Sequence, residues 1–246
     1  MFSKAYVTLL SSYDYLLAVL VLRESLIAVN SKYPLIVGVI DTLYDKVKPV
    51  FDSLDCTIFK IPTLQYRPEV IEKYQQQKGY DPHILNTASK IGLLDAPTEV
   101  AVYIDADTMV VQNVDDLFDY PDCSMYFSER EGMGLSGLMV FYPFAHDTNF
   151  YRQILESVPC LDGDIFGKLW TPTKTNLMYR IPANYLIDCF DGIDTLITKN
   201  QVKIVHFGAR PKPWQSISCH SMCHLQYFNY LNIVSTYIRK TKEIDA

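Results

Sequence analysis

The chain has 246 residues, of which 49% are hydrophobic and 20% are charged, and its 28 acidic and 22 basic side chains give a formal net charge of −6. A chain of this length buries enough surface to form a core unaided, which excludes a miniprotein held together by disulfides. The acidic balance argues against a surface that binds the phosphates of DNA or RNA. We therefore expect one globular domain with no nucleic-acid partner.

The start of the chain carries no sign of membrane insertion or secretion. The apolar run Tyr15–Leu22 is ended by Arg23 and Glu24, far short of the roughly 20 residues that a membrane span needs. The first ten residues resemble a strand rather than a secretory signal. Scattered cysteines stand at positions 56, 123, 160, 189, 219 and 223. We expect a cytoplasmic protein with reduced thiols and no membrane span.

Strands alternate with helices in the first half of the sequence. Apolar and β-branched runs predict strands at 5–10, 34–40, 56–61 and 99–104. Apolar residues at helical spacing predict a helix ending at 28 and others at 44–54 and 83–94. This alternation is typical of an α/β fold with a mostly parallel, mixed central sheet flanked by helices.

The second half is less regular, because prolines divide it into short pieces. Its patterns predict strands at 123–127, 138–142 and 202–207, and helices at 146–157 and 225–240. We find no linker and no internal repeat. We expect a single domain over 1–246, with a nucleotide-binding half at 1–120 and, at 121–246, a half that shapes the substrate site and ends in a helix.

Two carboxylates directly follow the most strand-like run of the chain. The sequence Val102-Tyr-Ile-Asp105-Ala-Asp107-Thr108 leads from a buried strand into an Asp-X-Asp motif. Parallel sheets bind ligands just beyond the carboxyl ends of their strands. Two oxygen ligands there suit Mg²⁺ or Mn²⁺ bridging to a diphosphate. The alternative is that both aspartates cap a turn.

Further segments, in order along the chain, extend this pattern. They are Tyr6-Val-Thr-Leu9 with Tyr15, Tyr103–Thr108, Asn113–Phe118, Ser136-Gly137, Asp162-Gly-Asp164, Ile181–Tyr185 and Val205–Trp214. As an ordered set they make the chain resemble the retaining glycosyltransferases of the glycogenin and galactinol synthase group, glycosyltransferase family 8. The resemblance implies the GT-A fold, a single Rossmann-like domain.

The resemblance also implies which residues serve the site. Residues that would contact the UDP-sugar are Leu9, Ser11, Tyr15, Lys90, Asp105, Ala106, Ser136, Gly137, Gly208 and Lys212. Ligands of a divalent ion would be Asp105, Asp107 and His206, and the imidazole favours Mn²⁺, with Mg²⁺ as the alternative. Asp164 would lie near the anomeric carbon with Asp162 close by, so that Asp164 carries the transfer, and Lys212 would bind the diphosphate.

The expected activity is transfer of a hexose from UDP-glucose or UDP-galactose to a separate glycan, polyol or protein acceptor. The chain departs from the family where Ile165 and Leu135 replace polar residues. These departures leave open an alternative, a catalytically silent module that binds a sugar nucleotide or a glycan. Dimerisation is also left open.

One further motif, Cys219-His-Ser-Met-Cys223-His224, resembles a zinc or haem attachment cluster. It lacks a second pair of ligands in sequence and is one residue too long for the haem motif. Sequence spacing therefore favours thiols without a metal at this place.

Overall fold

The computed structural model describes residues 1–76, 82–128, 133–170, 180–189, 193–208, 211–215 and 222–244. Its core is a seven-stranded sheet in the order β3-β2-β1-β4-β7-β6-β8, and a three-stranded sheet has the order β5-β10-β9. The strands are β1 (Phe2–Leu10), β2 (Leu35–Ile40), β3 (Ile58–Ile61), β4 (Thr98–Ile104), β5 (Thr108–Val110), β6 (Ser124–Ser128), β7 (Met133–Phe141), β8 (Arg180–Ile181), β9 (Leu186–Asp188) and β10 (Ile204–His206).

The first four strands of the large sheet are parallel. Strand β1 pairs in parallel with both β2 and β4, and β3 extends the sheet beyond β2. From β1 the chain adds β2 and then β3 on one side of β1. It then returns, so that β4 pairs with the other side of β1. Ligands of open α/β sheets bind where the strand order reverses in this way, so the carboxyl ends of β1 and β4 mark the expected position of a site.

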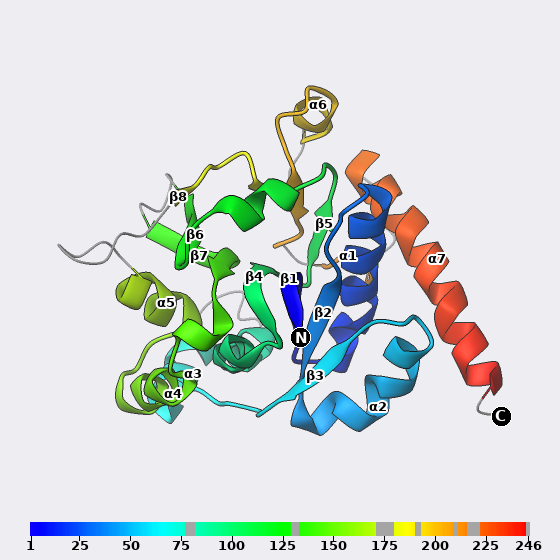
Figure 1. Cartoon of the computed structure of the whole chain (residues 1–246). Coiled ribbons are helices and arrows are strands. Elements are labelled where there is room, and N and C mark those ends of the chain that lie inside the picture. The colour runs from blue at the N-terminus through cyan, green and yellow to red at the C-terminus, as the bar shows by residue number, and fades with distance from the viewer. Residues whose placement is uncertain are drawn as a thin grey trace.

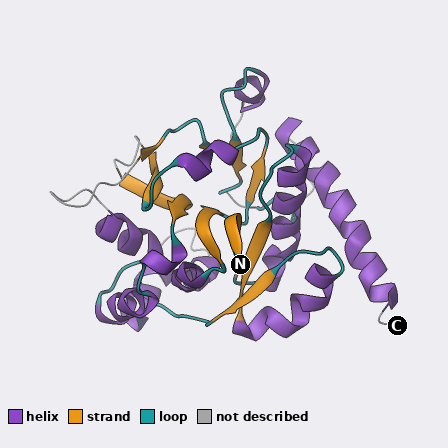
Figure 2. Cartoon of the chain, viewed as in Figure 1, coloured by secondary structure: helices purple, strands orange, loops and turns teal. Residues whose placement is uncertain are grey.

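Helices cover both faces of this sheet (Figures 1 and 2). In the view of Figure 1, α1 and α7 lie on one side and α3, α4 and α5 on the other. The α-helices are α1 (Leu16–Ala28), α2 (Asp41–Asp52), α3 (Pro68–Gln75), α4 (Thr148–Ser157), α5 (Asp162–Trp170), α6 (Ile193–Thr198) and α7 (Met222–Ile244). The 3-10 helices are η1 (Tyr13–Tyr15), η2 (Pro82–Asp95), η3 (Asp115–Asp119) and η4 (Pro143–Ala145). No helix within the described ranges is both long and apolar enough to cross a membrane.

Alternation along the central strands divides the core into two clusters. In β1, Tyr6 and Leu10 join the cluster on the α1 side, whereas Val7 and Leu9 join the cluster beneath η2 and α5. Successive side chains of a strand point to opposite faces, so a strand buried on both sides is apolar throughout. This explains why the runs at 5–10 and 99–104 look uniformly apolar in the sequence.

The structure confirms the predicted α/β architecture and corrects several elements. The segment predicted as a helix at 83–94 forms the 3-10 helix η2. Helices α3 and α5 were not predicted, because Pro68 opens the first and the second contains two glycines in nine residues, which lowers helix propensity. Strands β5 and β9 have three residues each, too few to show a periodic pattern.

Helix α1 offers a direct test of the core. Leu20 is fully buried, whereas Ile27 on the same helix is 53% exposed. We expect Leu20→Ala to lower the free energy of unfolding by about 2–5 kcal/mol, because it removes packed atoms and leaves a cavity. Ile27→Ala should change it by about 0.5 kcal/mol or less. Urea unfolding measures both, and equal losses would contradict this description of α1.

Candidate functional site

The Asp-X-Asp segment lies in a tightly fixed turn between β4 and β5. Thr8 Oγ1 of β1 donates to the Ile104 carbonyl at 2.8 Å, and Thr108 Oγ1 donates to the Asp105 carbonyl at 2.7 Å. The Asp105 amide donates to the Gly137 carbonyl at 3.0 Å. A Cβ on Gly137 would lie 3.0 Å from Asp105 Oδ2, so a larger residue at this position of β7 would crowd the Asp105 carboxylate.

Strand β10 brings His206 to the same turn. It pairs with β5 so that His206 stands opposite Thr108, and the Phe207 amide donates to the Asp107 carbonyl at 2.8 Å. His206 Nε2 lies 3.4 Å from Asp107 Oδ1, and Nδ1 lies 2.7 Å from Asp188 Oδ1. Burial alone would lower the pKa of His206, but its bonds to Asp107 and Asp188 outweigh this and raise the pKa to about 10.

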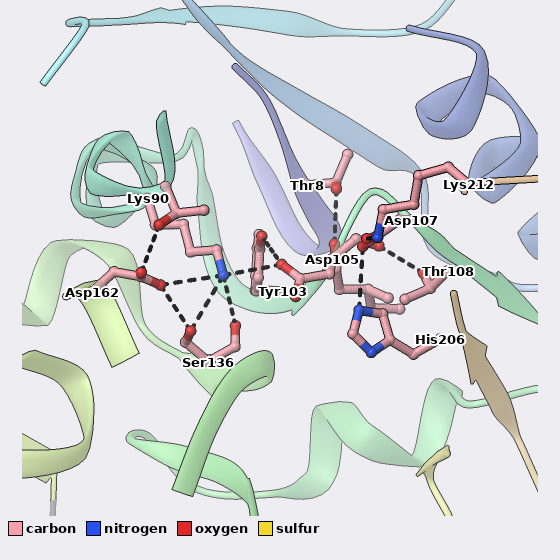
Figure 3. A network of polar contacts seen from close by, with 12 residues as sticks. Thr8, Lys90, Tyr103, Asp105, Asp107, Thr108, Ser136, Asp162, His206 and Lys212 are labelled. Carbon is pink, nitrogen blue, oxygen red and sulfur yellow. Dashed lines mark hydrogen bonds and ion pairs between the residues drawn. The ribbon is translucent and has the colours of Figure 1, made fainter. Parts of the chain in front are cut away.

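Asp105, Asp107 and His206 can together hold a metal ion. One ligand atom from each lies within 4.8 Å of the others, and Figure 3 shows Asp107 beside His206, with the Asp105 carboxylate between this pair and Lys90. Two carboxylate oxygens and one imidazole nitrogen fit Mn²⁺ or Mg²⁺. Asp188, which accepts from His206 Nδ1, would hold the ring so that Nε2 faces the ion, as ligating histidines usually require.

Lys212 contacts Asp107 and the backbone that follows β10. Its side chain is buried, and its ammonium donates to Asp107 Oδ2 and to the Phe207 carbonyl, both at 2.7 Å. Burial alone would raise the pKa of Asp107, but the bond to His206 and the charges of His206 and Lys212 lower it well below its usual range. Asp107 is therefore ionised at neutral pH.

A second cluster surrounds Lys90, which is 5% exposed (Figure 3). Its ammonium lies 3.0 Å from Asp105 Oδ1, 3.3 Å from Asp162 Oδ2 and 3.2 Å from Ser136 Oγ. Burial opposes the ammonium, yet the charges of Asp105 and Asp162 raise the pKa of Lys90 above its usual value. The sequence-based assignment of Lys90 and Ser136 thus corresponds to one contiguous group in space.

The two predicted acidic residues of α5 have different surroundings. Asp162 is buried, and its carboxylate accepts from the Tyr66 and Thr87 hydroxyls at 2.7 Å and from Ser136 at 2.8 Å. Asp164 is half-buried, and its Oδ2 accepts from the Leu161 amide at 3.3 Å. The structure therefore joins Asp162 to the Lys90 cluster, whereas Asp164 caps the start of α5.

The two clusters border a cavity of about 370 Å³ at the carboxyl ends of β1 and β4, a size typical of small-ligand sites. Its lining residues are Leu9, Ser11, Tyr15, Thr87, Lys90, Tyr103, Asp105, Ala106, Asp107, His206, Gly208 and Lys212. Ten of these were predicted. Thr87, Tyr103 and the supporting Asp188 were not: no local motif marks Thr87 or Asp188, and Tyr103 was read only as part of the strand that leads into the Asp-X-Asp motif.

Lys90 provides a test of the charge pairing. Lys90→Met leaves Asp105 and Asp162 without their shared ammonium, and breaking a buried ion pair typically costs about 3–5 kcal/mol. Lys48→Met, which removes an exposed pair with Asp52, is the control and should have little effect. Urea unfolding at pH 7 measures both. A loss no larger for Lys90→Met than for the control would contradict the proposed pairing.

The same variant has an expected pH dependence. Burial opposes the Asp162 carboxylate, but Lys90 and three hydroxyls lower its pKa in the folded state. Stability from this group is present above the unfolded pKa, about 3.9, and is lost as the pH falls below it. The stability difference between wild type and Lys90→Met should therefore shrink below pH of about 4.

Comparison with known proteins shows which proteins the chain is similar to. No protein-family model matches the chain. Galactinol synthase 10 of Arabidopsis thaliana is 31% identical over 253 residues, covering 86% of this chain and 71% of the relative. Human glycogenin-1 is 27% identical over 246 residues, covering 87% and 63%. Galactinol synthase 1 of Solanum lycopersicum is 31% identical over 126 residues, covering 50% of this chain and 38% of the relative, so the matched part is well under half of that protein.

Solved structures share the fold at low sequence identity. The glycosyltransferase GlyE of Streptococcus pneumoniae has a TM-score of 0.61 at 15% identity, covering 98% of this chain and 63% of its own. The galactosyltransferase LgtC, solved with donor and acceptor sugar analogs, has a TM-score of 0.59 at 14% identity, covering 93% and 95%. These likenesses confirm the predicted GT-A fold. With the sequence relatives, they show that the chain belongs to the glycosyltransferase family of the galactinol synthases and glycogenin, glycosyltransferase family 8.

Proposed function

We propose that the chain transfers a hexose from a UDP-sugar to a separate acceptor, with retention of configuration and with Mn²⁺ or Mg²⁺ as cofactor. The observation that supports this most is that Asp105, Asp107 and His206, whose ligand atoms lie within 4.8 Å of one another, line one cavity at the strand-order reversal. Galactinol synthases and glycogenin as relatives favour UDP-glucose or UDP-galactose as the donor.

The nucleotide would lie along β1 and the diphosphate beside β10. Leu9, Ser11 and Tyr15 line the cavity at the end of β1, and an aromatic ring can stack on a base. Tyr15 contacts Trp214 edge to face, with ring centroids 5.1 Å apart, which restrains its ring. When bound, the divalent ion would neutralise the diphosphate and stabilise the departing UDP.

In the transfer itself, the bond between the anomeric carbon and the phosphate oxygen breaks, and its electron pair leaves with UDP. The acceptor hydroxyl oxygen forms the new bond and gives up its proton to the phosphate oxygen of the departing UDP. Lys90 and Lys212 place ammonium groups on two sides of the cavity, where they can stabilise negative charge as it develops on the leaving group. A buried Asp162 with four partners is suited to orient Lys90 rather than to act as a free nucleophile.

Donor hydrolysis tests the proposed activity. With UDP-glucose or UDP-galactose and Mn²⁺, we expect release of UDP that a chelator abolishes. Asp107→Asn should reduce the rate at least about 100-fold, because the ion contributes several kcal/mol of charge stabilisation. Asp45→Asn on the exposed face of α2 is the control. If the protein binds UDP tightly but neither hydrolyses the donor nor transfers its sugar to sugar or polyol acceptors, the result would instead favour the silent binding module.

A second comparison separates Asp162 from Asp164. We expect Asp162→Asn to lower the rate of UDP release at least about 100-fold, because Lys90 loses a charged partner, while UDP affinity stays within a few-fold. Asp164→Asn retains an oxygen that can accept from Leu161 and should have a much smaller effect. Thermal unfolding of each variant checks that it folds. A larger loss of rate for Asp164→Asn would support the sequence-based assignment of that residue instead.

The state of the cysteines bears on the cell compartment in which the protein acts. No disulfide joins the cysteines that the structure describes, at positions 56, 123, 160, 189 and 223. Thiols of this kind persist in a reducing compartment such as the cytoplasm, which is where we place the activity.

A further inference from the structure

A second group of metal ligands lies behind His206, outside the cavity. Cys189 follows β9, and Cys223 and His224 stand in the first turn of α7. The two sulfurs are 3.3 Å apart, and His224 Nδ1 lies 3.9 Å from the Cys189 sulfur and 4.0 Å from the Cys223 sulfur. The fold thus supplies, from 34 residues away in sequence, the third ligand that the Cys-His motif lacked.

We propose that Cys189, Cys223 and His224 form a Zn²⁺ site that fastens the start of α7 to the strands carrying His206. With Zn–S bonds of about 2.3 Å and Zn–N bonds of about 2.0–2.1 Å, tetrahedral geometry places two sulfurs about 3.8 Å apart and a sulfur about 3.6 Å from a nitrogen. The three observed separations lie within about 0.5 Å of these values. Two thiolates and an imidazole favour Zn²⁺ over Mn²⁺ or Mg²⁺.

The surroundings of the three ligands fit this use. Two thiolates balance the charge of Zn²⁺, which suits a site where Cys223 is 1% exposed. The Cys223 amide donates to Asp194 Oδ1 at 3.0 Å, which fixes the backbone at this ligand. Cys223 and Asp194 also line a cavity of about 360 Å³, so an ion can approach the site from the side of Cys223.

A disulfide explains the arrangement less well. A sulfur–sulfur bond measures about 2.03–2.05 Å, so the two sulfurs would have to move closer. A disulfide also gives no role to His224, whose ring lies against Phe207 with centroids 5.6 Å apart. That contact already orients the imidazole beside both sulfurs. Cys219 and His220 of the original motif lie outside the described residues.

The position of this site links it to the donor site without sharing a ligand. The Cys189 amide donates to the His206 carbonyl at 2.7 Å, and the neighbouring Asp188 accepts from the His206 ring. An ion at Cys189, Cys223 and His224 would therefore hold the backbone of β9 and β10 in place.

Cobalt titration of the reduced, metal-free full chain tests the proposal. Thiolate ligands give Co²⁺ a near-ultraviolet charge-transfer band that carboxylate and imidazole ligands do not. We expect this band to saturate at one equivalent of Co²⁺ and to disappear when Zn²⁺ displaces Co²⁺. It should be lost in Cys189→Ser and in Cys223→Ser, and retained in Asp107→Asn. Cys56→Ser, which changes a buried cysteine at the β2–β3 edge, is the matched control.

His224→Ala keeps both thiols and covers the case in which a serine variant does not fold, which circular dichroism will show. It should keep a charge-transfer band but weaken Co²⁺ affinity by about tenfold or more. Three results would overturn the proposal: no band in the wild type, a band that survives both serine substitutions, or mass spectrometry that finds Cys189 and Cys223 joined as a disulfide in protein purified under reducing conditions. Each is independent of UDP release and so leaves the proposed transferase activity untouched.

Discussion

Charge compensation at the carboxyl edge of the sheet is the constraint on which the site depends. Four carboxylates and three cationic groups gather there: Asp105, Asp107, Asp162, Asp188, Lys90, Lys212 and His206. Carboxylates this close would repel strongly in a partly buried setting. Lys90 lies between Asp105 and Asp162, whereas Lys212 pairs with Asp107 and His206 lies between Asp107 and Asp188. Each carboxylate of the site therefore has a cationic partner within the protein.

The central part of the fold follows from patterns in the sequence. Strands β1, β2 and β4 are apolar on both faces and long enough to be recognised, and α1 and α2, which follow β1 and β2, were also predicted. The second half is different. Its sheet of β5, β10 and β9 is built from three-residue strands, whose pairing depends on contacts between distant segments. Local pattern carries no information about such pairing.

The residues of the site also differ in how far local sequence patterns predict them. Asp105 and Asp107 could be predicted from their place after a buried strand, because parallel sheets bind ligands there. His206 has no comparable local signal, and only family resemblance identified it. Asp188 was missed because an aspartate at the end of a short strand resembles any surface acid, yet it accepts from His206 Nδ1 at 2.7 Å. Asp162 and Asp164 are two positions apart, and only the fold shows which one meets Lys90.

The strand pair β9–β10 connects these observations. Asp188 and Cys189 are adjacent, yet one faces the ring of His206 and the other faces α7. A carboxylate set on one side and a thiolate set on the other attract different ions, because Mn²⁺ prefers oxygen and Zn²⁺ accepts sulfur. The two sites are close, because a hydrogen bond joins the Cys189 amide to the His206 carbonyl. The difference in ligand chemistry can nevertheless keep each ion at its own site. In this arrangement, an ion bound by the thiolates would hold in place the backbone that supports His206, the proposed metal ligand of the donor site.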